Sequence, residues 1–102
     1  MEKDLTLTEL YDIYGALLTK RQRELFEGYY LYDLSLSEIS EPEGKTRQSV
    51  FEAVKKVKAK LLEYEKTLNI KVKFDKIREI AKKVDNNKIK EQLLDLTDNI
   101  KQ

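Results

Sequence analysis

The sequence predicts an all-α protein. Apolar residues recur every three or four positions along most of the 102 residues, and paired capping residues stand in front of several of these runs. The chain contains only three Gly and one Pro, so long segments lack the residues that break helices. No convincing strand, internal repeat or low-complexity segment is present, and a chain of this length fits one small domain with an extension.

The first two expected helices begin at capping boxes. Thr6 is followed three residues later by Glu9, and Thr19 is followed by Gln22. Each hydroxyl can accept a hydrogen bond from a backbone amide while the longer side chain reaches back to the cap. The apolar faces are Leu7, Leu10, Tyr11, Tyr14, Leu17 and Leu18 in the first helix, which should end near Leu18, and Leu25, Phe26, Tyr29 and Tyr30 in the second, which should end near 31–34.

Six aromatic residues fall in this part of the chain: Tyr11, Tyr14, Phe26, Tyr29, Tyr30 and Tyr32. Such a cluster could stack on the bases of single-stranded nucleic acid. Most of its members lie on the apolar faces of the two helices, which favours a place in the core. Tyr32 lies off the pattern beside Asp33, and an exposed and a buried position fit it equally.

The next segment has the order of a helix-turn-helix. Ser35 and Glu38 form a third capping box in front of a short helix. In the turn that contains Pro42, Gly44 tolerates positive φ and lets the chain reverse between two helices. Thr46 can then cap a long helix, whose first turn is the kind of exposed tip that helix-turn-helix proteins present to the major groove.

The long helix should run from Thr46 to about Asn69, roughly 36 Å at 1.5 Å per residue. It carries a heptad seam of Val50, Val54, Val57, Leu61, Tyr64 and Leu68. A helix that only reads a groove needs much less length, so the C-terminal half of the seam must pack against the tail helices, a second subunit, or both. We therefore expect a homodimer built from this half and the tail.

Two further helices are expected in the tail. Their apolar residues are Phe74, Ile77, Ile80, Ala81 and Val84 in one and Ile89, Leu93, Leu94, Leu96 and Ile100 in the other. Asp85, Asn86 and Asn87 separate the two helices and offer a cap. The expected organisation is a helix-turn-helix domain over 1–70 and a C-terminal helical extension over 71–102.

Composition argues against several classes of function. The chain has no His, no Cys, no Gly-rich phosphate loop and no nucleophile elbow, so we expect no enzymatic activity, no metal site and no cofactor. The absence of Cys agrees with a reducing compartment, and no apolar run approaches 18 residues. We therefore expect a cytoplasmic protein without a membrane span.

The net charge of +1 hides an asymmetry. Residues 1–42 carry four Lys or Arg against nine Asp or Glu, whereas residues 43–60 carry six against two. The basic excess therefore falls on the first half of the long helix, where contact with nucleic acid would require it. A solvated helix face can produce the same excess.

Seven residues around the tip are the candidates for DNA contact: Lys45, Thr46, Arg47, Gln48, Ser49, Lys55 and Lys56. Arg and Gln can form bidentate contacts with guanine and adenine edges, and the lysines can reach neighbouring phosphates. The alternative is an ordinary solvated first turn. Glu52 favours that alternative because a carboxylate repels phosphate, and Glu43 and Lys45 make the turn unusually polar.

Three runs resemble region 4 of bacterial sigma-70 factors: 17–23, 33–39 and 46–50. With 9–19 in front and 62–68 behind, the chain more closely resembles the YlxM family of helix-turn-helix proteins, over about residues 7–70. The resemblance implies an all-α fold with a sigma-region-4-like unit, and it maps Arg47, Gln48 and Ser49 to the groove-reading tip. It also implies a role linked to the signal recognition particle pathway.

Three functions remain open at this point. The first is a small regulatory DNA-binding protein that works without a cofactor. The second is a protein-interaction module that docks on signal recognition particle or transcription components, and the third is RNA binding, for which no matching module is present. Salt dependence separates the first two, because phosphate contacts weaken steeply with salt and an apolar interface weakens little.

Overall fold

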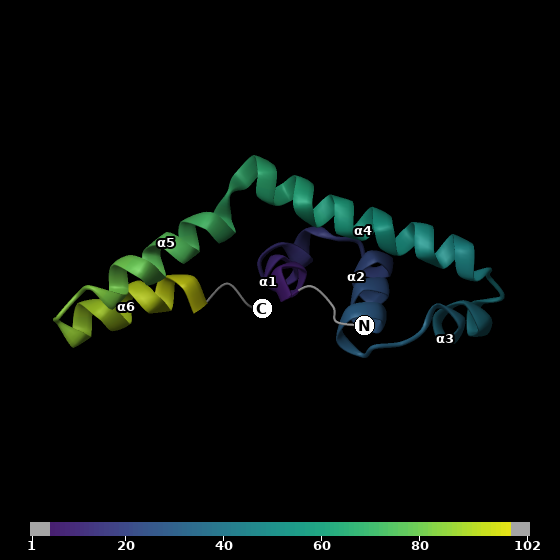
Figure 1. Cartoon of the computed structure of the whole chain (residues 1–102), viewed down its shortest axis with the longest axis horizontal. Coiled ribbons are helices and arrows are strands. Elements are labelled where there is room, and N and C mark those ends of the chain that lie inside the picture. The colour runs from purple at the N-terminus through teal and green to yellow at the C-terminus, as the bar shows by residue number, and fades with distance from the viewer. Residues whose placement is uncertain (1–4, 99–102) are drawn as a thin grey trace.

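The computed structural model describes residues 5–98 and consists of helices joined by short turns (Figure 1). The α-helices are α1 (Leu5–Tyr14), α2 (Lys20–Phe26), α3 (Leu36–Ser40), α4 (Arg47–Leu68), α5 (Ile70–Lys82) and α6 (Asn87–Asp98). A π-helical segment, Glu27–Leu31, extends α2, and 3-10 turns follow α1 and α3 at Gly15–Leu17 and Glu41–Glu43. In Figure 1, α4 lies above α1, α2 and α3, and the α5–α6 hairpin projects away from them. The predicted all-α fold is confirmed.

Two of the three predicted capping boxes form in full. The hydroxyl of Thr19 accepts from the Gln22 amide at 3.1 Å, and the Gln22 side chain accepts from the Thr19 amide at 2.9 Å. Ser35 and Glu38 form the same reciprocal pair before α3. At α6, the side-chain oxygen of Asn86 accepts from two amides of the first turn, as the sequence indicated.

The cap predicted at Thr6 is wrong. Helix α1 already includes Leu5, so Thr6 lies inside the helix instead of in front of it. The helical backbone around Thr6 places the next residue, Leu7, on the buried face of α1. The helix also ends at Tyr14, before the predicted end near Leu18. The chain must turn there, because Leu18 is buried in extended conformation directly before the cap of α2.

The core is built along one face of α4. The seam residues that are at most 3% exposed are Val50, Val54, Val57 and Leu61. Their spacing of four and three residues places them in a single stripe. Leu25 and Ile39 pack against the N-terminal half of this stripe, so α2 and α3 are both attached to the part of α4 that follows the turn.

The partner predicted for the C-terminal half of the seam is wrong. Val57 and Leu61 are covered within the same chain by Leu7 and Tyr14 of α1, and of the tail hairpin only Ile70, the first residue of α5, packs against this cluster. Helix α1 carries an apolar stripe of its own and folds back under α4, so it supplies the cover that the length of α4 requires. Further along, Leu68 is 41% exposed, which shows that the seam ends before the helix does.

Most of the aromatic residues belong to the core. The ring of Phe26 stacks between those of Tyr11 and Tyr30, with centroid distances of 4.3 and 4.7 Å. Tyr14 is 1% exposed, whereas Tyr32 is 69% exposed. The aromatic cluster is therefore a packing element and not an open platform for stacked bases.

A polar network fixes the bend between α4 and α5. Asn69, in the left-handed conformation with φ 56°, separates the two helices. The Glu65 carboxylate accepts from the Tyr14 hydroxyl at 2.5 Å and from two amides of the first turn of α5 at 3.0 and 3.2 Å. The Tyr14 oxygen in turn accepts from the Ile70 amide at 3.1 Å. The network satisfies amides that a helix start leaves free, and burial together with Glu65 raises the pKa of Tyr14 to about 12, so the phenol stays protonated.

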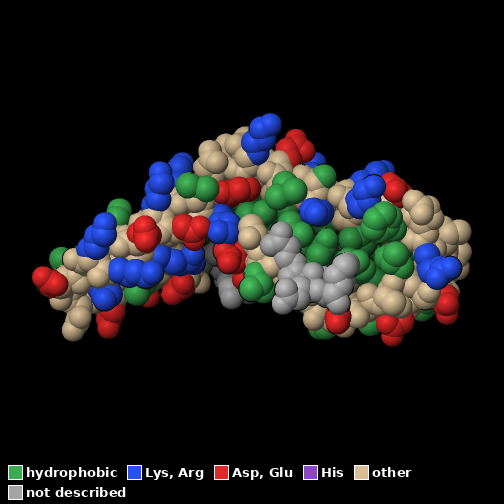
Figure 2. All heavy atoms as spheres, viewed as in Figure 1, with side chains coloured by type: hydrophobic (Ala, Val, Ile, Leu, Met, Phe, Trp, Pro, Cys, Tyr) green, Lys and Arg blue, Asp and Glu red, His purple; other side chains and the backbone are tan. Residues whose placement is uncertain are grey.

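The tail is a two-helix hairpin, α5 and α6, and one side of it is attached to the rest of the protein, α1 to α4, which we call the body. Helices α5 and α6 pack on each other, and α5 also contacts α1, where the Lys71 ammonium lies 3.0 Å from Glu9. On the face drawn in Figure 2, hydrophobic side chains gather beneath α4, whereas charged side chains predominate along the hairpin. Ile100, which the sequence assigned to the last apolar set, lies outside the described residues. In residues 5–98 no helix is both long and apolar enough to cross a bilayer.

We expect Gly44→Val to destabilise the protein through its backbone alone. Gly44 has φ +66°, and a Cβ built there meets no atom within 4 Å, so crowding plays no part. A β-branched residue resists this conformation, at a cost of about 1–2 kcal/mol. Gly44→Asn is the control and should lose less, because Asn tolerates left-handed backbone. Thermal unfolding measures both, and equal melting temperatures for the parent and the Val variant would contradict the left-handed turn.

We expect Tyr14→Phe to weaken the junction of α4 and α5. The change removes the hydroxyl that bonds to Glu65 and to the Ile70 amide, and a buried network that loses a member costs about 1–2 kcal/mol. The exposed Tyr32→Phe is the matched control, and its effect should stay within about 0.5 kcal/mol. Urea unfolding followed by circular dichroism compares the two, and equal midpoints would show that the network adds no stability.

Candidate nucleic-acid interface

The turn before α4 presents the first turn of that helix to solvent. The chain leaves the 3-10 turn through Gly44, and the hydroxyl of Thr46 then accepts from the Ser49 amide at 3.0 Å. The Ser49 hydroxyl donates to the Thr46 carbonyl at 2.9 Å. Thr46 and Ser49 therefore hold the helix start in place as well as lying on its surface, and the predicted cap at Thr46 is confirmed.

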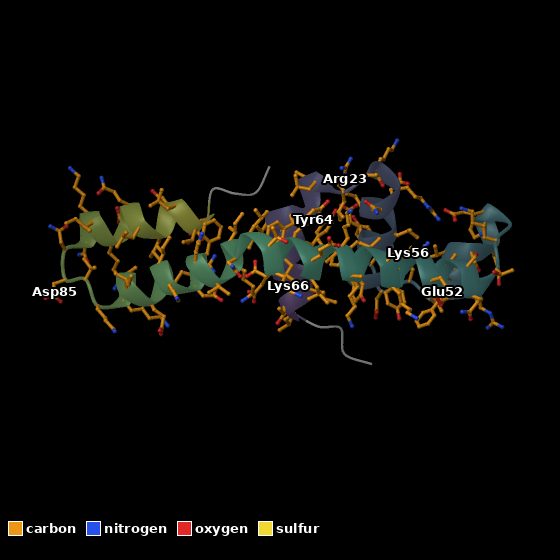
Figure 3. The ribbon with its side chains drawn as sticks, turned by 90° about the horizontal axis from the view of Figure 1, so that it is seen from above. Arg23, Glu52, Lys56, Tyr64, Lys66 and Asp85 are labelled. Atoms are coloured by element: carbon orange, nitrogen blue, oxygen red, sulfur yellow. The ribbon has the colours of Figure 1, made fainter. Side chains whose placement is uncertain are left out.

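All seven residues predicted to contact DNA are exposed. Residues 45–49 form a continuous exposed run, because Val50 is the first residue of α4 to enter the seam. Lys55 and Lys56 lie about two turns further along, roughly 10 Å from the tip at 1.5 Å per residue. Glu52 and Lys56, both labelled in Figure 3, are four residues apart and therefore project from the same side of α4, so a carboxylate lies between the tip and these lysines.

A groove of about 530 Å³ between α2 and α4 carries three cations. Lys45 comes from the turn, Lys56 from α4 and Arg21 from the start of α2. Among the residues that the structure describes, none of those lining this groove is acidic. The sequence did not identify Arg21 as part of the site, because it lies 22 residues before Glu43 and only the fold brings α2 beside the turn.

A second depression, of about 580 Å³, lies on the other side of the tip, between α3 and α4. Its lining residues are Leu36, Thr46, Arg47, Gln48 and Phe51. Phe51 is 39% exposed although it is large and apolar. Arg47 therefore lies beside an aromatic ring one helical turn away, and an apolar surface of this kind can contact a thymine methyl group. Sequence reasoning missed Phe51, whose signal is its position outside the seam.

Glu52 is engaged with two of the candidate residues. One of its oxygens accepts from the Gln48 side-chain nitrogen at 3.2 Å and lies 3.6 Å from the Lys55 ammonium. The Glu52 and Lys55 side chains are 49% and 57% exposed, so each such contact contributes at most about 1 kcal/mol. Gln48 and Lys55 must leave this carboxylate before they can contact a nucleic acid.

Arg21 and Glu43 form a forked ion pair between α2 and the turn. The two guanidinium nitrogens lie 2.5 and 2.6 Å from the two carboxylate oxygens. The hydrogen bonds from Arg21 hold the pKa of the Glu43 carboxyl below its usual range. The polar turn, which departs from the apolar residues usual at this place, is therefore fixed by a charge contact instead of by burial.

A third hollow, of about 450 Å³, lies between α1 and the hairpin. Its lining mixes both signs of charge, with Lys71 and Arg78 among the carboxylates of Glu9, Asp75 and Asp98. The Lys71 ammonium lies 3.0 Å from the Glu9 carboxylate and 2.8 Å from the Asp75 carboxylate, so ion pairs in this hollow connect the tail to α1. Within the described part of the chain, no group of three or more acidic or other metal-binding residues is placed to hold a metal ion.

Comparison with known proteins matches residues 1–100 to a family described as "Putative helix-turn-helix protein, YlxM / p13 like". A UPF0122 protein of Caldanaerobacter subterraneus subsp. tengcongensis is 50% identical over 92 residues, which cover 89% of this chain and 74% of that protein. A UPF0122 protein of Halalkalibacterium halodurans is 38% identical over 104 residues, which cover 98% of this chain and 95% of the relative. These matches include the tail, which the resemblance over 7–70 left out.

We expect the Arg21–Glu43 pair to stabilise the turn in a pH-dependent way. Because the pKa of Glu43 is lowered in the folded state, its contribution is present above the ordinary pKa of the carboxyl, 4.5, and is lost as the pH falls through the lower folded-state value. Glu43→Gln should lower the melting temperature at pH 7 and have little effect near pH 3. Glu41→Gln, in the same turn, is the control. A Glu43→Gln effect that stays constant from pH 7 to pH 3 would contradict the charge contact.

Proposed function

Because this chain belongs to the YlxM/p13-like family of helix-turn-helix proteins, we propose that it is a regulatory protein that binds double-stranded DNA through the first three turns of α4. The observation that supports this most strongly is the capped, exposed tip at 46–49 beside a groove lined by Lys45 and Lys56, whose third cation, Arg21, is paired with Glu43. A helix start of this kind can enter the major groove while neighbouring cations contact the phosphates. No cofactor is needed for this activity, and we place it in the cytoplasm.

Each part of the tip has a role in the proposed contact. Arg47 and Gln48 are long enough to reach base edges from the first turn of α4, where guanine and adenine accept bidentate contacts. Lys45 and Lys56 line the groove toward α2 and would contact one phosphate strand, with Lys55 on the neighbouring part of the outward face. The Phe51 ring would lie against the floor of the major groove.

The charges of the tip limit the strength of this binding. Glu52 repels phosphate and competes for Gln48 and Lys55, and Glu43 neutralises Arg21. About four cations remain for the phosphates, and non-specific binding by so few contacts has a dissociation constant on the order of 10⁻⁴ M or weaker at physiological salt. We therefore expect detectable affinity for random duplex only at low ionic strength, and tighter binding only where Arg47 meets its preferred base.

A second candidate function is docking on a protein partner, such as a component of the signal recognition particle or the transcription machinery. The observation that favours it is the surface after the π-helical segment, where Leu31 and Tyr32 are 45% and 69% exposed next to Asp33 with φ 57°. Exposed apolar residues beside a well-ordered core are a feature of interaction sites. This surface lies outside the tip, so substitutions in the tip distinguish the two functions.

We expect duplex affinity to fall steeply with salt and to depend on the lysines of α4. In fluorescence anisotropy with a labelled random-sequence duplex between 20 and 200 mM salt, about four phosphate contacts give a log–log slope near −3.6. Replacing Lys55 and Lys56 together by Gln should reduce the slope by about 2. Lys82 and Lys83, an equivalent adjacent pair at the end of α5, are the matched control and should leave the slope unchanged when replaced by Gln.

Two single substitutions test separately how a positive and a negative side chain near the tip affect DNA binding. Arg47→Ala should cost about 1–3 kcal/mol on a preferred site, and Glu52→Gln should strengthen non-specific binding because it removes a repulsive charge. Undetectable duplex affinity at 20 mM salt in both the parent and Glu52→Gln would exclude the proposed function and leave docking as the explanation of the fold. Preference for RNA over duplex DNA in the same assay would exclude it as well.

A further inference from the structure

The α5–α6 hairpin has a polar side, which faces the body, and an apolar side opposite to it. Arg78 lies 4.0 Å from Asp98, and this ion pair marks one side of the two helices. Lys71 and Asp75 lie on the same side of α5, and Lys71 reaches Glu9 of α1 from there. The contacts between hairpin and body combine these charged groups with Ile70, which packs against the core at the start of α5.

The opposite side of the hairpin is apolar on both helices. Ile80 follows Arg78 by two residues and Leu96 precedes Asp98 by two, which is about 200° around each helix, so both lie away from the ion pair. Ile89, seven residues before Leu96, returns to the same face of α6. We call this surface the hairpin face and define it by Ile77, Ile80, Val84, Ile89, Leu93 and Leu96.

The hairpin face is open to solvent to a degree that is unusual for aliphatic residues. Ile80 is 56% exposed, Ile89 is 47% exposed and Leu96 is 65% exposed, and the other three members are partly buried between the helices. No described residue of the body covers this side. A pair of amphipathic helices can bury only the seam between them, so the face needs a further layer to become a core.

We propose that the hairpin face binds the same face of a second copy of this chain, so that the two hairpins form a four-helix bundle. The six residues that define the face are aliphatic, and Lys73, seven residues before Ile80, lies on the same side of α5. An aliphatic surface of this kind is complementary to itself under a two-fold axis, as an isologous dimer requires. The charged side chains next to it, Lys73 and Lys76, have long aliphatic stems that can cover the rim while their ammonium groups stay in water.

The size of the hairpin face agrees with a dimer. Thirteen residues of α5 span about 20 Å, and two helices side by side are about 20 Å wide, which gives a projected area of about 400 Å². The accessible area of a corrugated side-chain surface is larger than its projection. Two such faces together reach about 800 Å² or somewhat more, which is below the roughly 1,200 Å² of standard-size interfaces and indicates a weak, concentration-dependent dimer.

This dimer does not depend on DNA binding. The sequence predicted a homodimer built from the second half of α4 and the tail; α1 occupies that surface of α4, so the proposed contact uses the tail alone. The tip of α4 lies at the far end of the molecule, whose long axis measures 56 Å, so both copies keep their helix-turn-helix units free (Figure 1).

Analytical ultracentrifugation of the full chain at tens of micromolar tests the proposal. The chain mass is 12.1 kDa, and we expect the parent to sediment at about 24 kDa. Ile80→Glu with Leu96→Glu should return it to the monomer mass with its helical circular dichroism retained, because both side chains are already more than half exposed and the change does not disturb the core. Val72→Glu is the matched control, since Val72 is 45% exposed on α5 outside the face and should leave the dimer intact.

Three outcomes would overturn the proposal. The first is a parent that sediments at the monomer mass across this concentration range. The second is a dimer that survives Ile80→Glu with Leu96→Glu, or that Val72→Glu dissociates equally well, because either would place the contact elsewhere. The third is a monomeric parent that floats with vesicles of anionic phospholipid and loses this on Ile80→Glu with Leu96→Glu, which would make the face a membrane contact.

Discussion

The burial of one aliphatic stripe on α4 is the interaction on which the rest of the structure depends. Four residues from Val50 to Leu61 are almost completely shielded from water, and α1, α2 and α3 each supply apolar side chains to the same stripe. The long helix α4 therefore holds α1, α2 and α3 together by packing against each of them, and none of these three helices is long enough to be stable alone. Because residues of the stripe belong to both hydrophobic clusters of the core, packing against α4 sets the positions of α1, α2 and α3.

The position of the candidate interface follows from the same stripe. Once one side of α4 is buried, its opposite side must face solvent, and the charged residues between Lys45 and Lys56 lie on that side or at its margins. The conformation of the turn before α4 then sets how far the tip projects into solvent. Gly44 reverses the chain, Thr46 caps the helix, and the Arg21–Glu43 pair ties the turn to α2. The tip is thus held by backbone geometry and one charge contact, and the Arg47 side chain is exposed at its surface.

What the sequence could predict was local. Thr19, Ser35 and Thr46 cap their helices because each cap involves residues three apart, and the left-handed Gly44 follows from the residue type alone. The seam was visible because helical periodicity is also a local property. Contacts that join distant segments were not visible in this way. The bond from Tyr14 to Glu65 spans 51 residues, and neither residue carries a signal that indicates its partner.

The cover of the seam illustrates the same limit. Helical spacing indicates that a stripe must be buried, but several amphipathic helices in the chain could bury it, and the sequence pattern does not choose among them. The tail follows α4 directly in the sequence and is therefore the nearest candidate. Asn69 and the Glu65 network instead turn α5 away from α4, and α1 takes the place.

The central claim is that the outward side of the first three turns of α4 contacts duplex DNA while the rest of the molecule serves as scaffold. Nuclear magnetic resonance titration of the ¹⁵N-labelled protein with a random-sequence duplex at low salt tests it most directly. We expect the largest amide shifts between Lys45 and Lys56 and unchanged amides in α5 and α6. Shifts that concentrate in the hairpin, or an unchanged spectrum at saturating duplex, would contradict it.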